Sequence, residues 1–242
     1  MKLALIVLTG LLTTTSPALT HNKLYETGAM APTACKLPSM PNRGHKAVSA
    51  HVNNLLTCLD TAWGKHLGGY GKPWVRYYTD GSAKFCGGKV GDSAPGAYCN
   101  IDHQIAIIVP EAVREYAPEV GFMLVMAHEY GHHIQYTTGM WDAVLKERFK
   151  DKKQLLEANR RYELQADCLA GVYIGANWQG QKRSVGEWGA LMALTWAIGG
   201  EKGSMTNDHG SRENRASWFN KGFAAESPSV CNTWSAPSSK VA

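Results

Sequence analysis

The chain has 242 residues, of which 44% are hydrophobic and 19% are charged, and its formal net charge is +5. This composition supports a packed core and excludes a disordered chain, and the length fits one domain, with one or two lobes. The basic residues are dispersed apart from the mixed-sign run 146–153, which we expect to be a solvated helix face. No nucleic-acid motif is present, so we expect no nucleic-acid partner.

Residues 1–20 have the organisation of a secretory signal peptide. Lys2 supplies the positive end, Leu3–Leu12 is an apolar segment, and residues 16–18 are the expected cleavage region. The apolar segment is too short for a stable membrane span, although an uncleaved anchor is the alternative. We therefore expect a secreted or periplasmic protein with no stable membrane insertion after signal cleavage.

The next segment, residues 21–84, begins with proline-rich residues 21–44, which we expect to be irregular. Apolar residues at helical spacing through 45–67 predict a packing helix. Residues 74–78 predict a short strand, and the run Ile105–Val109, which ends at a proline, predicts another.

The sequence H-E-Y-G-H at 128–132 follows a nearly apolar, helix-favouring run at 120–127. Because residues four apart lie on one helix face, His128 and His132 can bind one zinc ion. Glu129 points about 100° round the helix from His128, where it can reach a metal-bound water without being a ligand. A structural histidine pair is the alternative, but such groups are costly in a core without a partner.

A catalytic zinc site needs a third protein ligand. Gln135 and Thr138 stand where metzincins have a glycine and a third histidine, which excludes that class. Glu163 and Asp167 lie four apart in Leu155–Trp178, which predicts a helix, and are the best candidates. One carboxylate can bind the metal while the other fixes the tautomer of a ligand histidine, and a solvated acidic face is the alternative.

Two further helices are predicted downstream. Ser184 and Glu187 have the spacing of a capping box, and the helix that they open runs through Ala197. Ser211 can cap a later helix that carries Trp218.

His209 lies in the loop before that last helix. A histidine there can donate a hydrogen bond to the oxyanion of a tetrahedral intermediate, and Asp208 is a lesser candidate to orient it. A surface or loop-stabilising role is the alternative. Residues 235–242 predict a disordered tail.

Six cysteines fit an exported chain and allow three disulfides, although spacing alone does not decide the connectivity. We expect sequential pairing, which gives Cys35–Cys58, Cys86–Cys99 and Cys168–Cys231. The second would close a glycine-rich hairpin, and the third would fasten the C-terminal tail to the helix that carries Glu163. Cysteine ligation of zinc is the alternative, but the chain has no C-x-x-C pair.

Several motifs together, in order, resemble the putative neutral zinc metallopeptidase family of bacteria: HEYGHHIQ at 128–135, ELQADCLAG at 163–171, DHGS at 208–211, RASWF at 215–219 and CNTW at 231–234. The resemblance covers residues 85–234, which we expect to be the metallopeptidase domain. It implies an α+β, zincin-like fold of the gluzincin type, mainly helical, with a small sheet beside the HExxH helix. In such folds a strand placed like Ile105–Val109 pairs its exposed edge with substrate, and a core strand is the alternative.

The family resemblance also implies His128, His132 and Glu163 as zinc ligands and Glu129 as the catalytic base. We therefore expect an exported endopeptidase that cleaves peptide bonds through a zinc-activated water. His209 is expected as a further catalytic group, and Asp167 as the carboxylate that supports a ligand histidine without binding the metal itself. A peptide or protein is the expected substrate, and a monomer the expected state. A catalytically silent zinc-binding or partner-binding protein and a cell-wall peptide amidase are the alternatives.

Overall fold

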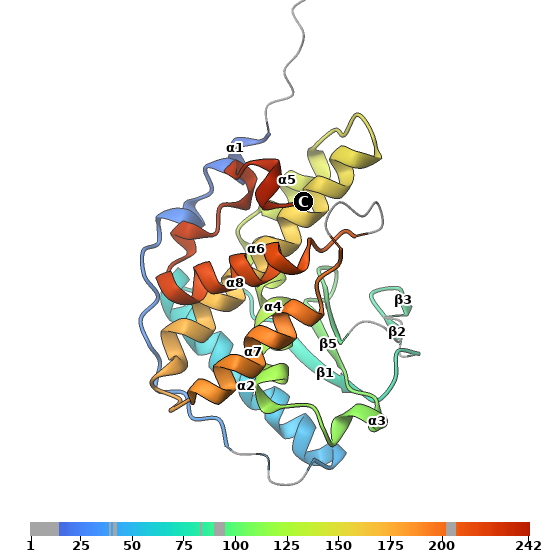
Figure 1. The fold of residues 1–242 in the computed structure, drawn as a ribbon, viewed down its shortest axis with the longest axis vertical. Helices are drawn as coiled ribbons and strands as arrows, with labels where there is room; N and C mark the ends of the chain where they lie inside the picture. The colour runs from blue at the N-terminus through green and yellow to red at the C-terminus, as the bar shows by residue number, and fades with distance from the viewer. Residues whose placement is uncertain (1–14, 39, 41–42, 83, 90–94, 202–206) are drawn as a thin grey trace, which may run out of the picture.

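The computed structural model describes residues 15–38, 40, 43–82, 84–89, 95–201 and 207–242. Most of the predicted signal peptide, including Leu3–Leu12, lies outside these residues. The described chain is an α+β fold, mainly helical with a small sheet (Figure 1). Among the described helices, none combines the length and the apolar character that crossing a membrane requires.

Three strands form the main sheet, in the order β1 (Trp74–Tyr78), β5 (Gln104–Ile108) and β4 (Gly96–Cys99). Strand β1 pairs in parallel with β5, and β4 pairs antiparallel with the other side of β5. The run at 105–109 thus belongs to the central strand, whose residues are all buried. The interpretation that its exposed edge pairs with substrate is wrong, because both edges of β5 are already hydrogen-bonded.

Two very short strands, β2 (Lys84–Phe85) and β3 (Gly88–Lys89), form a separate hairpin. The disulfide Cys86–Cys99 ties this hairpin to the end of β4. All six cysteines are paired sequentially, and the other two disulfides are Cys35–Cys58 and Cys168–Cys231.

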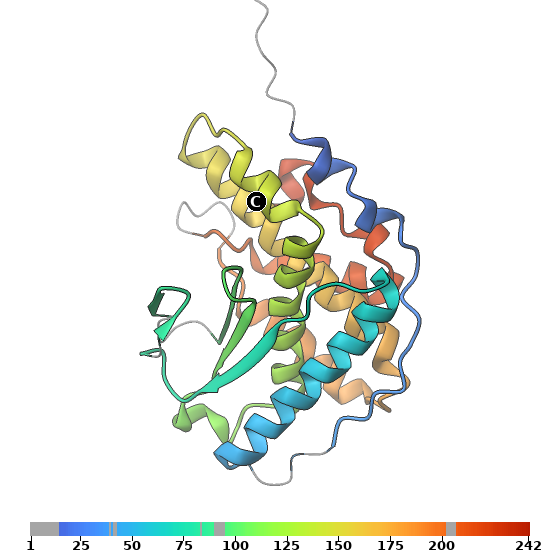
Figure 2. The ribbon, with the colours of Figure 1, turned by 180° about the vertical axis from the view of Figure 1, so that it is seen from behind.

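The longer helices are packed around one central helix, α4 (Glu119–Thr137). Helix α2 (His45–Leu67) and the sheet lie on one side of it, as Figure 2 shows. Helices α6 (Lys152–Trp178), α7 (Val185–Ala197) and α8 (Arg212–Ala225) lie on the other side (Figure 1). The remaining described helices are α1 (Pro17–Thr20), α3 (Glu111–Arg114) and α5 (Met140–Lys146), with short 3-10 turns η1 (Lys23–Glu26), η2 (Pro228–Val230), η3 (Thr233–Ser235) and η4 (Ser238–Lys240).

The helix starts follow the predicted side-chain chemistry. At α7, Ser184 accepts a hydrogen bond from the Glu187 N–H, and the Glu187 carboxylate accepts one from the Ser184 N–H, which completes the capping box. At α8, the Ser211 hydroxyl accepts a hydrogen bond from the N–H of Asn214.

Both ends of the described chain pack onto the helical body. Leu19, near the amino end, is fully buried. At the other end, Val241 is fully buried, and its carbonyl accepts a hydrogen bond from Arg160. The prediction of a disordered tail at 235–242 is therefore wrong, because tertiary contacts order residues that have no helical or strand periodicity of their own.

Helices α6 and α8 approach each other so closely that glycine is required at the contact. A Cβ atom built on Gly222 would overlap with the carbonyl of Cys168, and one built on Gly171 would overlap with the carbonyl of Phe219. These contacts hold α8 directly against α6, the helix that carries Glu163.

We expect Gly222→Ala to lower the free energy of unfolding by about 1–3 kcal/mol, because the new methyl group must push two backbones apart. Gly189→Ala is the matched control: it lies on the exposed face of α7 with no atom near the added methyl group, and should stabilise the fold slightly. Urea unfolding of both variants tests this, and equal stabilities would contradict the close packing of α6 against α8.

Candidate metal centre

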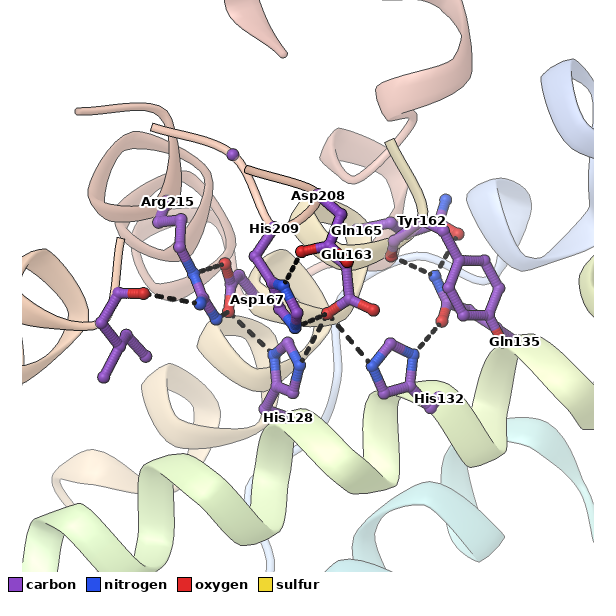
Figure 3. A network of polar contacts seen from close by, with 12 residues as sticks. His128, His132, Gln135, Tyr162, Glu163, Gln165, Asp167, Asp208, His209 and Arg215 are labelled. Carbon is purple, nitrogen blue, oxygen red and sulfur yellow. Dashed lines mark hydrogen bonds and ion pairs between the residues drawn. The ribbon is translucent and has the colours of Figure 1, made fainter. Parts of the chain in front are cut away.

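His128 and His132 on α4 and Glu163 on α6 bring three metal-ligating atoms together. One ligand atom from each residue lies within 4.8 Å of the other two. The Nε2 atoms of His128 and His132 lie 3.3 Å and 3.5 Å from Glu163 Oε2 (Figure 3). Two ligands of a tetrahedral zinc ion with bonds of about 2.0–2.1 Å lie about 3.3 Å apart, so the separations of both imidazoles from Glu163 match those of zinc ligands.

The tautomer of His128 is set by a buried ion pair behind it. Its Nδ1–H donates to Asp167 Oδ1 at 2.8 Å, which leaves Nε2 facing Glu163. Asp167 also accepts two hydrogen bonds of 2.8 Å from Arg215, so its carboxylate is fixed from both sides. Burial raises the pKa of Asp167, but Arg215 and His128 outweigh burial and hold it at about 2.

The tautomer of His132 follows from a chain of two glutamines. Gln135 donates its amide hydrogens to the Tyr162 carbonyl and to Gln165 Oε1, so its own Oε1 can only accept. The His132 Nδ1 atom, 2.8 Å away, must therefore be the donor, and Nε2 keeps its lone pair. Figure 3 shows this chain behind the imidazole.

The glycine directly before the second histidine of the HExxH motif lets the two ligand helices meet. A Cβ atom built on Gly131 would lie 3.0 Å from both the Cα and the carbonyl oxygen of Ala166. Ala166 stands between Glu163 and Asp167 on the face of α6 that is turned towards α4.

The buried and half-buried charges of the described site residues sum to a negative value. Three carboxylates, those of Glu129, Glu163 and Asp167, stand against one guanidinium, that of Arg215. Burial lowers the pKa of His128, but Asp167 and Glu163 outweigh it and raise the pKa to about 10. The site therefore favours additional positive charge, and two neutral imidazoles with a divalent cation satisfy this demand.

Glu129 lies where two cavities meet. One cavity, of about 350 Å³, is bordered by the aromatic side chains of Tyr98, Trp141 and Tyr162, and the other, of about 670 Å³, by Leu124, Val125 and Ile198. Gly96, His128, Glu129 and His209 border both. A Cβ atom on Gly96 would lie 2.6 Å from a Val125 methyl group, so the edge strand β4 runs directly beside α4 at this point.

His209 lies beside the three converging side chains. Its Nε2 is 3.5 Å from Glu163 Oε2, yet among the described residues the compact metal-ligating group consists of His128, His132 and Glu163 only. Its Nδ1 lies 2.6 Å from Asp208 Oδ1, and half of its side chain is exposed. Asp208 is thus within hydrogen-bond distance of the ring, and its role in orienting His209 stays a prediction.

Three groups that hold the site in place are missing from the sequence predictions. Gln135 appears there as the residue that excludes a metzincin and as the end of the HEYGHHIQ motif, but not as a partner of His132, although its position one helical turn after His132 was a usable signal. Gln165 and Arg215 lie inside motifs that carry the family resemblance, but the partners of a buried side chain far along the chain cannot be read from spacing.

A family model described as "Putative neutral zinc metallopeptidase" matches residues 1–234. The chain belongs to this family. The uncharacterized protein YpfJ of Escherichia coli K12 is 29% identical over 216 residues, which cover 80% of this chain and 73% of YpfJ. The uncharacterized protein Rv2575 of Mycobacterium tuberculosis H37Rv is 28% identical over 204 residues, which cover 74% of this chain and 68% of Rv2575. No solved structure matches the chain.

Membership of this family suggests a zinc peptidase. The side chains of His128, His132 and Glu163 are a possible zinc-binding group. The three disulfides are consistent with a protein that works outside the cytoplasm.

We expect Asp167→Asn to weaken zinc binding about 10- to 100-fold, because His128 loses the charged acceptor that fixes its tautomer. Asp142→Asn, which removes the same charge from an exposed position on α5, is the matched control. Zinc titration against a competing chelator measures both, and circular dichroism shows whether Arg215 still packs without its partner. Unchanged affinity in Asp167→Asn would contradict the orienting role.

Proposed function

We propose that the protein is an exported zinc-dependent endopeptidase with a zincin-like fold, in which His128, His132 and Glu163 hold zinc. The observation that carries this proposal is the convergence of two imidazole lone pairs and one carboxylate oxygen, with Glu129 beside them at the junction of two cavities. A purely structural zinc site needs no such additional carboxylate.

The bound metal would supply a Lewis acid that makes water acidic near neutral pH and polarises the scissile carbonyl. Glu129 accepts the proton of the attacking water and passes it to the leaving amine. Burial raises the pKa of Glu129, while His128 and His132 act in the opposite direction. A carboxylate in such surroundings is a stronger base than one in water, which suits proton transfer to an amine.

His209 is the second catalytic group that we propose. Its Nδ1 faces the Asp208 carboxylate at 2.6 Å, so Nδ1 donates there when the ring is neutral, and protonation also makes Nε2 a donor. Nε2 borders both cavities next to Glu163, where it can donate to the carbonyl oxygen as that atom gains negative charge.

The sheet supports an extended polypeptide as the substrate. Strand β4 is at the edge of the sheet and runs past Glu129, so its free backbone groups can pair with an added strand. The cavities continue on both sides of Glu129, which leaves room for substrate residues before and after the cleaved bond. This arrangement favours an endopeptidase, which we expect to act as a monomer.

Glu129→Gln should bind one zinc ion per chain as the wild type does and lose casein hydrolysis by at least about 100-fold, because the proton acceptor is gone. Glu163→Ala should instead lose the metal. Metal analysis and casein hydrolysis on the same preparations measure both effects.

Full zinc occupancy in Glu163→Ala would show that the ligand assignment is wrong. Zinc in the wild type without hydrolysis of casein would reject a general endopeptidase, and peptidoglycan fragments would then test for a cell-wall amidase.

His209→Ala should lower kcat about 100- to 1,000-fold while zinc occupancy and KM change little, because the side chain acts on charge that develops in the transition state. Steady-state kinetics with a quenched peptide measure this. A kcat equal to that of the wild type would assign His209 a role in the loop alone.

A further inference from the structure

The smaller of the two cavities beside Glu129 has a wall of three aromatic rings. Tyr98 comes from β4, Trp141 from α5 and Tyr162 from α6. All three side chains are only partly buried, which leaves aromatic surface open in a cavity of about 350 Å³. The wall therefore offers apolar contacts directly next to the catalytic groups that we propose.

The three rings are held in place by their neighbours. Tyr162 stacks on His132, with the ring centroids 5.0 Å apart and the planes 15° from parallel (Figure 3). The Trp141 ring lies 5.7 Å from the Tyr162 ring, and the Tyr98 hydroxyl lies 2.9 Å from His133 Nδ1. A wall that is already ordered loses little conformational freedom when it binds a ligand.

Strand β4 turns the wall towards the path that we propose for the substrate. Gly96 and Tyr98 are two residues apart, so they lie on one face of β4, and both border the cavity. A polypeptide strand added to the edge of β4 would place every second side chain on this same face. One such side chain would therefore enter the cavity next to Glu129.

The charges around the cavity disfavour an acidic occupant. Among the described residues that border it there is no lysine and no arginine, whereas Glu129 and Glu163 are both there. Its remaining polar group of note is Asn100, whose amide forms no hydrogen bond within the described parts of the chain and can bind an uncharged polar group of a ligand.

We propose that the smaller cavity is a specificity pocket for a large uncharged side chain of the substrate, aromatic in preference, and that Trp141 determines this preference. The inference rests on the proposed function and names the class of substrate that the site accepts. An aromatic side chain gains edge-to-face or stacked contacts with the three rings in addition to burying apolar area. Alanine would leave most of the cavity unfilled.

The first experiment measures binding apart from cleavage. The zinc-loaded Glu129→Gln chain is titrated calorimetrically with blocked, alanine-rich octapeptides that carry Phe, Leu, Ala, Lys or Asp at one central position. The Phe peptide should bind at least about 10-fold more tightly than the Ala peptide, and more tightly than the other three. This series decides the preference even if no Trp141 variant folds.

Trp141→Ala, added to the same chain, should weaken binding of the Phe peptide about 10-fold and change binding of the Ala peptide by less than about 2-fold. Trp141→Phe keeps an aromatic ring and should retain the preference. Trp196→Ala is the matched control, because Trp196 is 45% exposed on α7 and borders neither cavity. Zinc occupancy should stay unchanged throughout, since neither tryptophan is a candidate ligand.

Cleavage by the active chain gives a second readout. Mass spectrometry of the products should place the cleaved bond at one fixed distance from the Phe residue, and Trp141→Ala should lose this fixed register. A wild type that binds the Phe peptide through Trp141 and cleaves none of the peptides would reject the proposed function but retain the pocket.

Three results would overturn the pocket itself. They are equal affinity for the Phe and Ala peptides, tighter binding of the Lys or Asp peptide than of the Phe peptide, and a loss in Trp141→Ala that the Ala peptide shares equally. Tighter binding of chitotriose than of the Phe peptide would likewise overturn it and assign the aromatic wall to a glycan.

Discussion

The candidate site depends on the contact between α4 and α6. Gly131 lies against Ala166, and this approach brings the histidines of one helix within reach of Glu163 and Asp167 on the other. A Cβ atom at position 131 would lie 3.0 Å from two backbone atoms of Ala166, so any side chain there would push the helices apart by at least a few tenths of an ångström, and ligand positions tolerate only about 0.5 Å. Gly131, the second of the two positions that the motif leaves open between Glu129 and His132, is therefore constrained by packing.

The parts of the site that sequence predicts are those that lie along a single helix. The spacing of His128 and His132 places both on one face of α4, and the spacing of Glu163 and Asp167 does the same on α6. The edge strand could not be predicted in the same way. A run of β-branched residues such as 105–109 fits a central strand and an edge strand equally well, and pairing with both neighbours decides the matter.

The C-terminal tail is a second feature whose structure could not be predicted from the sequence, for a different physical reason. Residues 235–242 have little apolar character and no periodicity, yet their carbonyl groups accept hydrogen bonds from side chains of α6 and α8, including Arg160 and Trp218. Just before the tail, the carbonyl of Cys231 accepts a hydrogen bond from Gln165, which in turn accepts one from Gln135 behind His132. The disulfide Cys168–Cys231 fixes that carbonyl, so the C-terminal segment helps to orient a ligand histidine.

Helix α4 is also held on the face opposite the site. His133 is fully buried, and burial lowers its pKa to about 4, so the ring stays neutral. Its Nε2–H donates to the Gly71 carbonyl at 2.7 Å, and its Nδ1 therefore accepts from the Tyr98 hydroxyl at 2.9 Å. Tyr98 belongs to the edge strand β4 and borders the smaller cavity. One neutral histidine thus joins the back of the HExxH helix to the strand that we expect to pair with substrate, so the catalytic groups and the substrate backbone are positioned by the same helix.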